Sequence, residues 1–362
     1  MLCCSPLLRS PKKLNQGLMS PRSGNFDLSG PNPGVSIDWN NVDYRRSVLS
    51  SLVEGAYILE RDRLEKHDEI QALAPPWWKS FHFELYHKFI DKTGSIFGAI
   101  YEYKYPYPVP NSPQYVIAFR GTILKKRTAS SDIKSNFKCL LNKLHETPSF
   151  QEAMYYVHKM VDEGARVWLA GHSLGSAMAL LAGKEMAKMG HLLETYLFNP
   201  PFFSFPLEGA IKDERVKFRI RCATSVFKTG LTALNVVVNG GQAYDPFAVL
   251  STWVPYLFVN PDDPICSEYI GYFEHRKKMK ENGVGILEMV ATKNSTRNLC
   301  LSVLGMDSRS EPLHLLPSAD LTINRDQFPD IEGVFAAYKK FKRAHGIQQW
   351  WNLSLYESMR YN

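Results

Sequence analysis

The stretch from Val167 to Gly183, VWLAGHSLGSAMALLAG, constrains the fold of this chain more than any other segment. An apolar, β-forming run leads into G-H-S-L-G, and a run of small and helix-forming residues follows it. This order predicts a buried strand, a sharp turn and a helix, with Ser173 in the turn between Gly171 and Gly175. The pattern G-x-S-x-G alone occurs by chance in roughly one chain in ten of this length. The predicted strand–turn–helix context makes Ser173 a candidate nucleophile.

The rest of the chain alternates predicted strands with predicted helices. We expect strands at 95–104, 114–122, 165–170, 194–201 and 254–264. We expect a helix at 42–67, where one apolar stripe indicates that it is amphipathic, and another at 132–144. A third helix is expected to begin after the N-cap signal Thr147-Pro148, and a fourth to run from 174 to a stop at Gly190. This alternation predicts an α/β fold with a mostly parallel central sheet flanked by helices. Ser173 then lies at the carboxyl edge of that sheet, where α/β folds place their sites.

Length and composition indicate one large globular domain with an N-terminal tail. The chain has 362 residues, of which 44% are hydrophobic and 22% are charged. Residues 1–26 contain no Asp or Glu and are rich in Ser, Pro, Lys and Arg, which predicts a disordered or targeting tail. We expect a single domain over 27–362. A candidate cap insertion lies around 205–250, where the uncharged run TGLTALNVVVNGG could cover the site.

Charge and cysteine patterns argue against several classes of protein. The net charge is +7, but the basic runs HRKKMK and KKFKR lack the interleaved aromatic residues and glycines of a nucleic-acid module. The six cysteines form no disulfide framework and no C-x-x-C zinc pair. No apolar run reaches the length of a membrane span, and the stretch MLCCSPLLRSPKK lacks the apolar run that is typical of a signal peptide. We expect a cytoplasmic protein without a nucleic-acid partner, although the tail could direct it to an organelle. Lipidation of Cys3 and Cys4 would add peripheral membrane contact.

A nucleophilic serine needs a base, and the base needs an acid that orients it. In serine hydrolases with this strand–turn–helix arrangement, the acid and then the histidine follow the serine along the chain. Asp262 and Asp263 come just after a predicted strand, although both could simply form a turn next to proline. Of the later histidines, His275 lies in a charged helical run and is expected to be exposed. Position alone does not separate His314, a candidate core strand residue, from His345.

Two motifs together resemble the class 3 lipases, especially their plant relatives in the α/β-hydrolase superfamily. These motifs are YVIAFRGT and, further along, VWLAGHSLGSAMALLAG, and the match runs from roughly Tyr115 to the end of the chain. The resemblance implies an α/β-hydrolase fold and a catalytic triad that begins at Ser173. Asp263-Pro264-Ile265 matches the acid segment of the family better than Asp262 does. Ala344-His345, ahead of two tryptophans, matches its histidine segment, whereas HLLPSADL, which begins at His314, resembles the strand that precedes that segment.

The resemblance also implies an oxyanion hole. The segment Phe119-Arg120-Gly121-Thr122 would end a strand and place the backbone N–H of Thr122 there, with the N–H of Leu174 as the second donor. The implied activity is that of a serine carboxylic-ester hydrolase, a lipase or esterase that needs no cofactor and acts on acyl esters.

The stretch ILKKRTASSDIKS, at 123–135, departs from the family because it is polar and basic where secreted relatives carry a lid. Smaller or membrane-derived esters therefore fit the sequence as well as bulk triglyceride does. Two alternatives remain open at this point. One is a catalytically silent lipase-like scaffold or signalling protein, and the other is an acyltransferase or thioesterase that uses the same triad.

Overall fold

The computed structural model describes residues 37–67, 77–122, 144–202, 249–281, 313–326, 336–351 and 356–361. The predicted tail at 1–26, the polar stretch at 123–135, all but Leu144 of the helix expected at 132–144, and all but the last two residues of the candidate cap at 205–250 lie outside this part. Within the described ranges, no helix combines the length and the apolar character that crossing a membrane requires.

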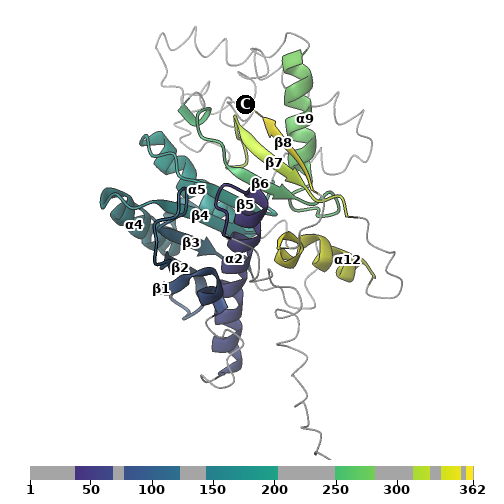
Figure 1. The fold of residues 1–362 in the computed structure, drawn as a ribbon. Helices are drawn as coiled ribbons and strands as arrows, with labels where there is room; N and C mark the ends of the chain where they lie inside the picture. The colour runs from purple at the N-terminus through teal and green to yellow at the C-terminus, as the bar shows by residue number, and fades with distance from the viewer. Residues whose placement is uncertain are drawn as a thin grey trace, which may run out of the picture.

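A sheet of eight strands in sequence order organises the described part of the chain (Figure 1). It consists of β1 (Phe83–Ile90), β2 (Ile96–Tyr103), β3 (Tyr115–Phe119), β4 (Val167–His172), β5 (Thr195–Phe198), β6 (Tyr256–Val259), β7 (Ala319–Ile323) and β8 (Glu357–Tyr361). The strands from β3 to β7 pair in parallel, and pairing is antiparallel at both edges of the sheet. The predicted α/β class with a mostly parallel central sheet is confirmed.

The five predicted strands correspond to β2 through β6. Strand β1 was not predicted, because two register irregularities, between Leu85 and His87 and between Phe89 and Ile90, interrupt the alternation of its side chains. The strand that the family resemblance implied at HLLPSADL corresponds to β7, which begins only at Ala319. The edge strand β8 was not predicted, because a strand of five residues carries little periodic signal.

Helices cover both faces of the sheet (Figure 1). One apolar cluster joins the sheet to α2 (Val42–Glu65) and to the turn η3 (Ile347–Trp350). The other joins it to α4 (Pro148–Asp162), α5 (Leu174–Lys188) and α9 (Glu268–Glu281). Consecutive residues of β3 alternate between the two clusters, as the pleat of a strand requires. The remaining elements are η1 (Trp77–Phe81), η2 (Leu144–Glu146) and α12 (Ala336–His345).

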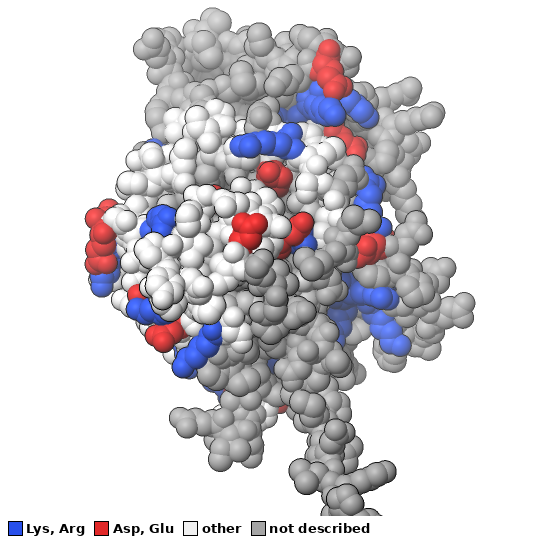
Figure 2. All heavy atoms as spheres, in the orientation of Figure 1, with Lys and Arg blue, Asp and Glu red and all other residues white. Residues whose placement is uncertain are grey.

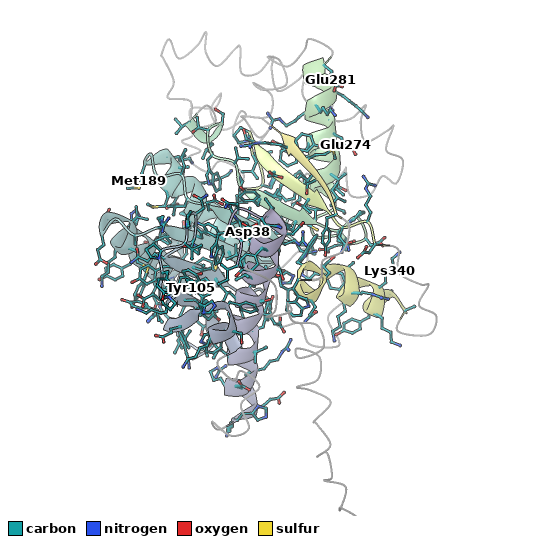
Figure 3. The ribbon with its side chains drawn as sticks, in the orientation of Figure 1. Asp38, Tyr105, Met189, Glu274, Glu281 and Lys340 are labelled. Carbon is teal, nitrogen blue, oxygen red and sulfur yellow. The ribbon has the colours of Figure 1, made fainter. Side chains whose placement is uncertain are left out.

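Side chains fill the space on both sides of the sheet, and exposed residues such as Met189 and Lys340 lie at the periphery (Figure 3). Basic and acidic side chains are interspersed over the described surface on the face that Figure 2 shows.

Two helix ends have the geometry that their capping residues predicted. The side chain of Thr147 accepts a hydrogen bond from the N–H of Phe150, and Gly190 follows α5 with a φ of 91°.

The prediction that the first helix is amphipathic is wrong. Every residue of α2 from Tyr44 to Glu60 is buried, including the polar ones. The outer side of the helix is covered by the C-terminal part of the chain: the Arg46 guanidinium donates to the carbonyl of Trp350 at 3.0 Å, and the Ser47 hydroxyl donates to that of Trp351 at 3.1 Å. Packing on both sides, which no local pattern records, therefore brings α2 into the interior near the site.

Candidate active site

The turn that carries Ser173 has the geometry predicted from the sequence. β4 ends at His172, α5 begins at Leu174, and Ser173 between them adopts φ 56° and ψ −123°. A positive φ is strained for a residue with a side chain and persists only where packing imposes it. A Cβ atom on Gly175 would overlap the carbonyl oxygen of Phe119 at the end of β3. The turn is therefore tight enough to exclude any larger residue there.

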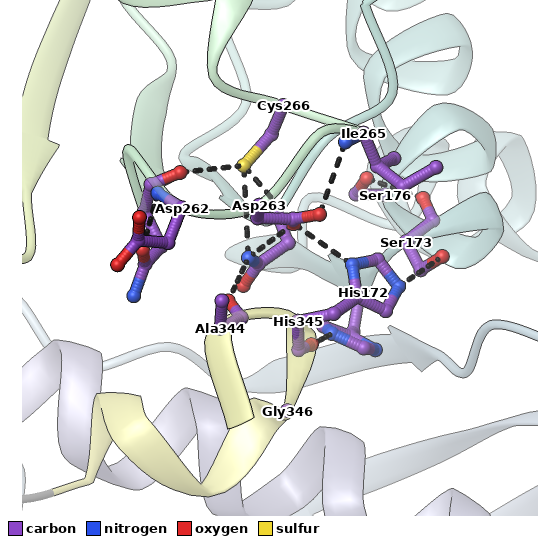
Figure 4. A network of polar contacts seen from close by, with 12 residues as sticks. His172, Ser173, Ser176, Asp262, Asp263, Ile265, Cys266, Ala344, His345 and Gly346 are labelled. Carbon is purple, nitrogen blue, oxygen red and sulfur yellow. Dashed lines mark hydrogen bonds and ion pairs between the residues drawn. The ribbon is translucent and has the colours of Figure 1, made fainter. Parts of the chain in front are cut away.

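Three side chains from distant parts of the chain meet at this turn (Figure 4). The Oγ of Ser173 lies 2.9 Å from the Nε2 of His345, the last residue of α12. The Nδ1 of the same imidazole lies 2.8 Å from the Oδ2 of Asp263, in the loop after β6. Ser173 and Asp263 are 2% and 0% exposed. The structure thus joins a hydroxyl, an imidazole and a carboxylate into one buried hydrogen-bonded chain.

The other candidate residues lie elsewhere. The carboxylate of Asp262 is about half exposed and pairs with Lys340 at 3.4 Å. His314 lies in a turn, where its ring packs on Phe202 with centroids 4.6 Å apart, so it is not the strand residue considered above. His275 was expected to be exposed but is buried, because α9 packs against the sheet through its apolar residues.

Four hydrogen bonds converge on the carboxylate of Asp263, and all of them come from donors. Its Oδ1 accepts from the N–H of Ile265, and its Oδ2 accepts from His345, from the Nδ2 of Asn199 at 2.7 Å and from the Sγ of Cys266 at 3.2 Å. Burial by itself raises the pKa of Asp263, but the His345 imidazole and these hydrogen bonds outweigh it and hold the pKa below its ordinary value. The ionised carboxylate can only accept, so Nδ1 of His345 carries a hydrogen, and in the neutral imidazole Nε2 then faces Ser173 with its lone pair.

Asn199 is a residue of this network that the sequence analysis missed. It follows β5 with a φ of 48° and is fully buried. Its Nδ2 also donates to the carbonyl of Ala344 at 3.0 Å, and its Oδ1 accepts from the Nε1 of Trp350 at 2.7 Å. Asn199 thereby ties Asp263 to the end of α12. An asparagine at the carboxyl end of a predicted parallel strand was the available signal.

His172, which hydrogen-bonds to the backbone of His345, was also not predicted as part of this network. Its Nε2 lies 2.7 Å from the carbonyl oxygen of His345, and its Nδ1 lies 2.8 Å from the hydroxyl of Tyr57 in α2. A carbonyl oxygen can only accept, so Nε2 carries the hydrogen and Nδ1 accepts from the tyrosine. Burial, together with the nearby His345, lowers the pKa of His172 to about 3. His172 is therefore a neutral imidazole at physiological pH.

The neutral state of His172 predicts a pH-dependent stability. The pKa of a histidine in an unfolded chain is about 6.5. As the pH falls from about 6.5 toward 3, the unfolded chain binds a proton that folded His172 does not, so the free energy of unfolding decreases by up to about 1.4 kcal/mol per pH unit. Urea unfolding of the wild type and of His172→Asn between pH 4.5 and 7 should show the steeper slope only in the wild type. Equal slopes would contradict the prediction.

The two predicted oxyanion donors each lie next in the chain to a residue that packs at the serine turn. Leu174 is in the first turn of α5, where a backbone N–H has no acceptor within the helix. Gly121 packs so closely that a Cβ atom there would lie 2.8 Å from the Cβ of Ser173 and 2.7 Å from the hydroxyl of Tyr57. Thr122, next along the chain, is exposed at this edge of the site. In the described ranges, no three His, Cys, Asp or Glu side chains are grouped so that they could hold a metal ion.

The chain is similar to several known proteins. Residues 116–205 match the family model described as lipase (class 3). An Arabidopsis thaliana protein named as a GDSL esterase/lipase is 44% identical over 356 residues, which cover 92% of this chain and 96% of the relative. Among solved structures, a lipase from Rhizopus microsporus var. chinensis aligns with 65% of this chain and 73% of its own, at 16% identity and a TM-score of 0.32. Lipase II from Rhizopus niveus aligns with 62% and 73%, at 13% identity and a TM-score of 0.31.

The central sheet, the strained serine turn and the buried Ser–His–Asp chain define an α/β hydrolase. The chain belongs to the class 3 lipase family, as its sequence motifs indicated. Family and relative together support a hydrolase of the lipase or esterase type that acts on an ester substrate. The name of the Arabidopsis thaliana relative contains the letters GDSL. The serine motif of this chain reads G-H-S-L from Gly171 to Leu174, so that His172 and not an aspartate precedes the serine.

Proposed function

We propose that this protein is a serine carboxylic-ester hydrolase that cleaves lipid-derived acyl esters through an acyl-enzyme on Ser173. The observation that supports this proposal is the unbroken hydrogen-bonded chain from Ser173 through His345 to Asp263, with distances of 2.9 and 2.8 Å. Such distances are within the reach that proton transfer requires.

In the first half of the proposed reaction, the Oγ of Ser173 attacks the carbonyl carbon of the ester while Nε2 of His345 takes the hydroxyl proton. Asp263 holds the imidazole in the required tautomer and stabilises the imidazolium that forms. The imidazolium then protonates the departing alcohol, which leaves the acyl group on Ser173. Water, deprotonated by His345, then attacks this acyl-enzyme. The bond between the acyl carbon and Oγ of Ser173 breaks, the imidazolium returns its proton to Oγ, and the carboxylic acid is released.

The negative charge of each tetrahedral intermediate develops on the former carbonyl oxygen. We assign its stabilisation to the backbone N–H groups of Thr122 and Leu174, with a contribution from the N-terminal dipole of α5. Loss of one such donor typically lowers kcat by about 10²–10³-fold. Leu174 suits this role because its N–H belongs to the residue after the nucleophile and is unused by the helix.

The proposal is tested by labelling the purified protein with a fluorophosphonate, which phosphonylates an activated serine. We expect one adduct, located by mass spectrometry on the peptide that contains Ser173, and no adduct in Ser173→Ala. A correctly folded wild type that stays unlabelled would favour a lipase-like scaffold over an enzyme. In a labelled protein, release of free fatty acid from an acyl ester, with no acyl transfer to added alcohols or thiols, separates a hydrolase from an acyltransferase.

A further inference from the structure

Both peptide groups that flank Gly121 are held by side chains. The N–H of Gly121 donates to the hydroxyl of Tyr57 at 2.7 Å, and its carbonyl accepts from Nη1 of Arg120 at 2.6 Å. In a trans peptide the carbonyl and the following N–H point in opposite directions. The bond to Arg120 therefore orients the N–H of Thr122 away from the guanidinium. The Arg120 side chain, and not only the backbone of the loop, thus fixes the orientation of this peptide.

Arg120 is itself anchored on the side of β2. Its Nη2 donates to the hydroxyl of Ser95 at 2.7 Å, and its Nε donates to the carbonyl of Ile96 at 2.5 Å. The carboxylate of Glu60, in α2, lies 3.7 Å from the same guanidinium and accepts from Ser95 and from the N–H of Ile96. The guanidinium is thus fixed by a strand and a helix before it reaches Gly121.

Tyr57 connects the other side of this peptide to the base. Its hydroxyl accepts from Gly121 and donates to Nδ1 of His172 at 2.8 Å, and Nε2–H of His172 donates to the carbonyl of His345 at 2.7 Å. Burial raises the pKa of Tyr57, so the hydroxyl keeps the hydrogen that this arrangement needs. A continuous path of hydrogen bonds therefore runs from Gly121 to the backbone of His345.

We propose that Tyr57 and His172 are positioning residues, which together with Arg120 hold the Thr122 N–H and His345 in the relative placement that the tetrahedral intermediate requires. This inference rests on the proposed function. None of the three side chains needs to touch the substrate. Their contribution is greater in the transition state than in the bound substrate, because the oxyanion develops only as the tetrahedral intermediate forms.

The test uses Tyr57→Phe in the full chain. This variant keeps the ring in the core but removes both hydrogen bonds, so that the N–H of Gly121 and Nδ1 of His172 lose their partner. We expect kcat for a soluble ester to fall by about 10–10²-fold, less than for the loss of an oxyanion donor, while KM stays within about twofold. Tyr101→Phe is the matched control, because Tyr101 is buried in the same apolar cluster and its hydroxyl has no hydrogen-bond partner in the described part of the chain. Its kcat and KM should equal those of the wild type.

A second readout separates positioning from general loss of structure. A trifluoromethyl ketone adds to Oγ of Ser173 and places an oxyanion in the hole as the serine proton moves to His345, whereas the matching amide binds without reacting. Tyr57→Phe should weaken binding of the ketone by about the same factor by which it lowers kcat, and it should leave binding of the amide unchanged. If Tyr57→Phe does not fold, Arg120→Lys provides the same comparison, since a lysine cannot reach the two carbonyls and Ser95 together.

Three results would overturn the inference. In the first, kcat and ketone affinity of a folded Tyr57→Phe equal those of the wild type. In the second, amide and ketone weaken equally, which would show a general loss of the site. In the third, Tyr101→Phe loses as much activity as Tyr57→Phe. Failure of the proposed function is seen separately, as the absence of fluorophosphonate labelling in the wild type.

Discussion

Replacing His345 by alanine is expected to lower kcat for ester hydrolysis by about 10⁴–10⁶-fold. The imidazole is hydrogen-bonded to the hydroxyl of Ser173 at 2.9 Å, and a serine hydroxyl without a base is a poor nucleophile. Steady-state hydrolysis of a soluble p-nitrophenyl ester measures the loss, and the rate of fluorophosphonate labelling should decrease in parallel. KM should change much less than kcat, because the imidazole acts mainly on the proton that moves in the transition state.

His314→Ala provides the matched control for this variant. His314 is a half-buried histidine that packs against the ring of Phe202, and the sequence alone made it a candidate for the same role. We expect kcat and labelling of His314→Ala to stay within about twofold of the wild type. Labelling of His345→Ala at the wild-type rate, or an equal loss in both variants, would show that His345 is not the base.

The second large effect is expected for Asp263→Asn, which should lower kcat by about 10⁴-fold. The four groups that hydrogen-bond to the carboxylate are all donors. The NH₂ group of an asparagine at this position would therefore face at least one donor, with which it cannot form a hydrogen bond unless that partner becomes an acceptor. His345 can then receive a hydrogen bond at Nδ1, which leaves Nε2 protonated toward Ser173 and unable to act as a base. Hydrolysis rates between pH 6 and 9 measure this loss.

The same substitution should also decrease the free energy of unfolding, by about 1–3 kcal/mol, because it leaves a buried donor without a partner. Asp262→Asn is the control, since the neighbouring carboxylate is about half exposed and pairs with an exposed lysine. It should change neither kcat nor the midpoint of urea unfolding measurably. If Asp262→Asn lost activity and Asp263→Asn kept it, the acid would be assigned to Asp262.

Local patterns in the sequence were sufficient to predict part of this fold. The strand, the turn at Ser173 and the following helix were predictable, because a turn this tight requires small residues at fixed distances from the serine. The cap of α4 and the parallel centre of the sheet were predictable for similar reasons, since each depends on neighbours in the sequence or on a regular period.

The acid and the base depend on contacts that span much of the chain. Nothing local distinguishes Asp263 from Asp262, or His345 from His314. The structure distinguishes them because the end of α12 meets the loop after β6 at the carboxyl edge of the sheet. Motif resemblance selected the same residues beforehand, but only as an expectation.

The sequence by itself therefore determined the α/β class, the tight turn at Ser173 and the identity of the candidate nucleophile, since these follow from residues that are close together in the chain. Only the tertiary structure decided which residues surround that serine. Tyr57 meets His172 because α2 packs across the sheet, and Asn199 meets Asp263 because parallel strands end at a common edge. The tertiary structure also sets the charge states of these groups. Burial away from water keeps His172 neutral, and the donors around Asp263 keep its carboxylate ionised.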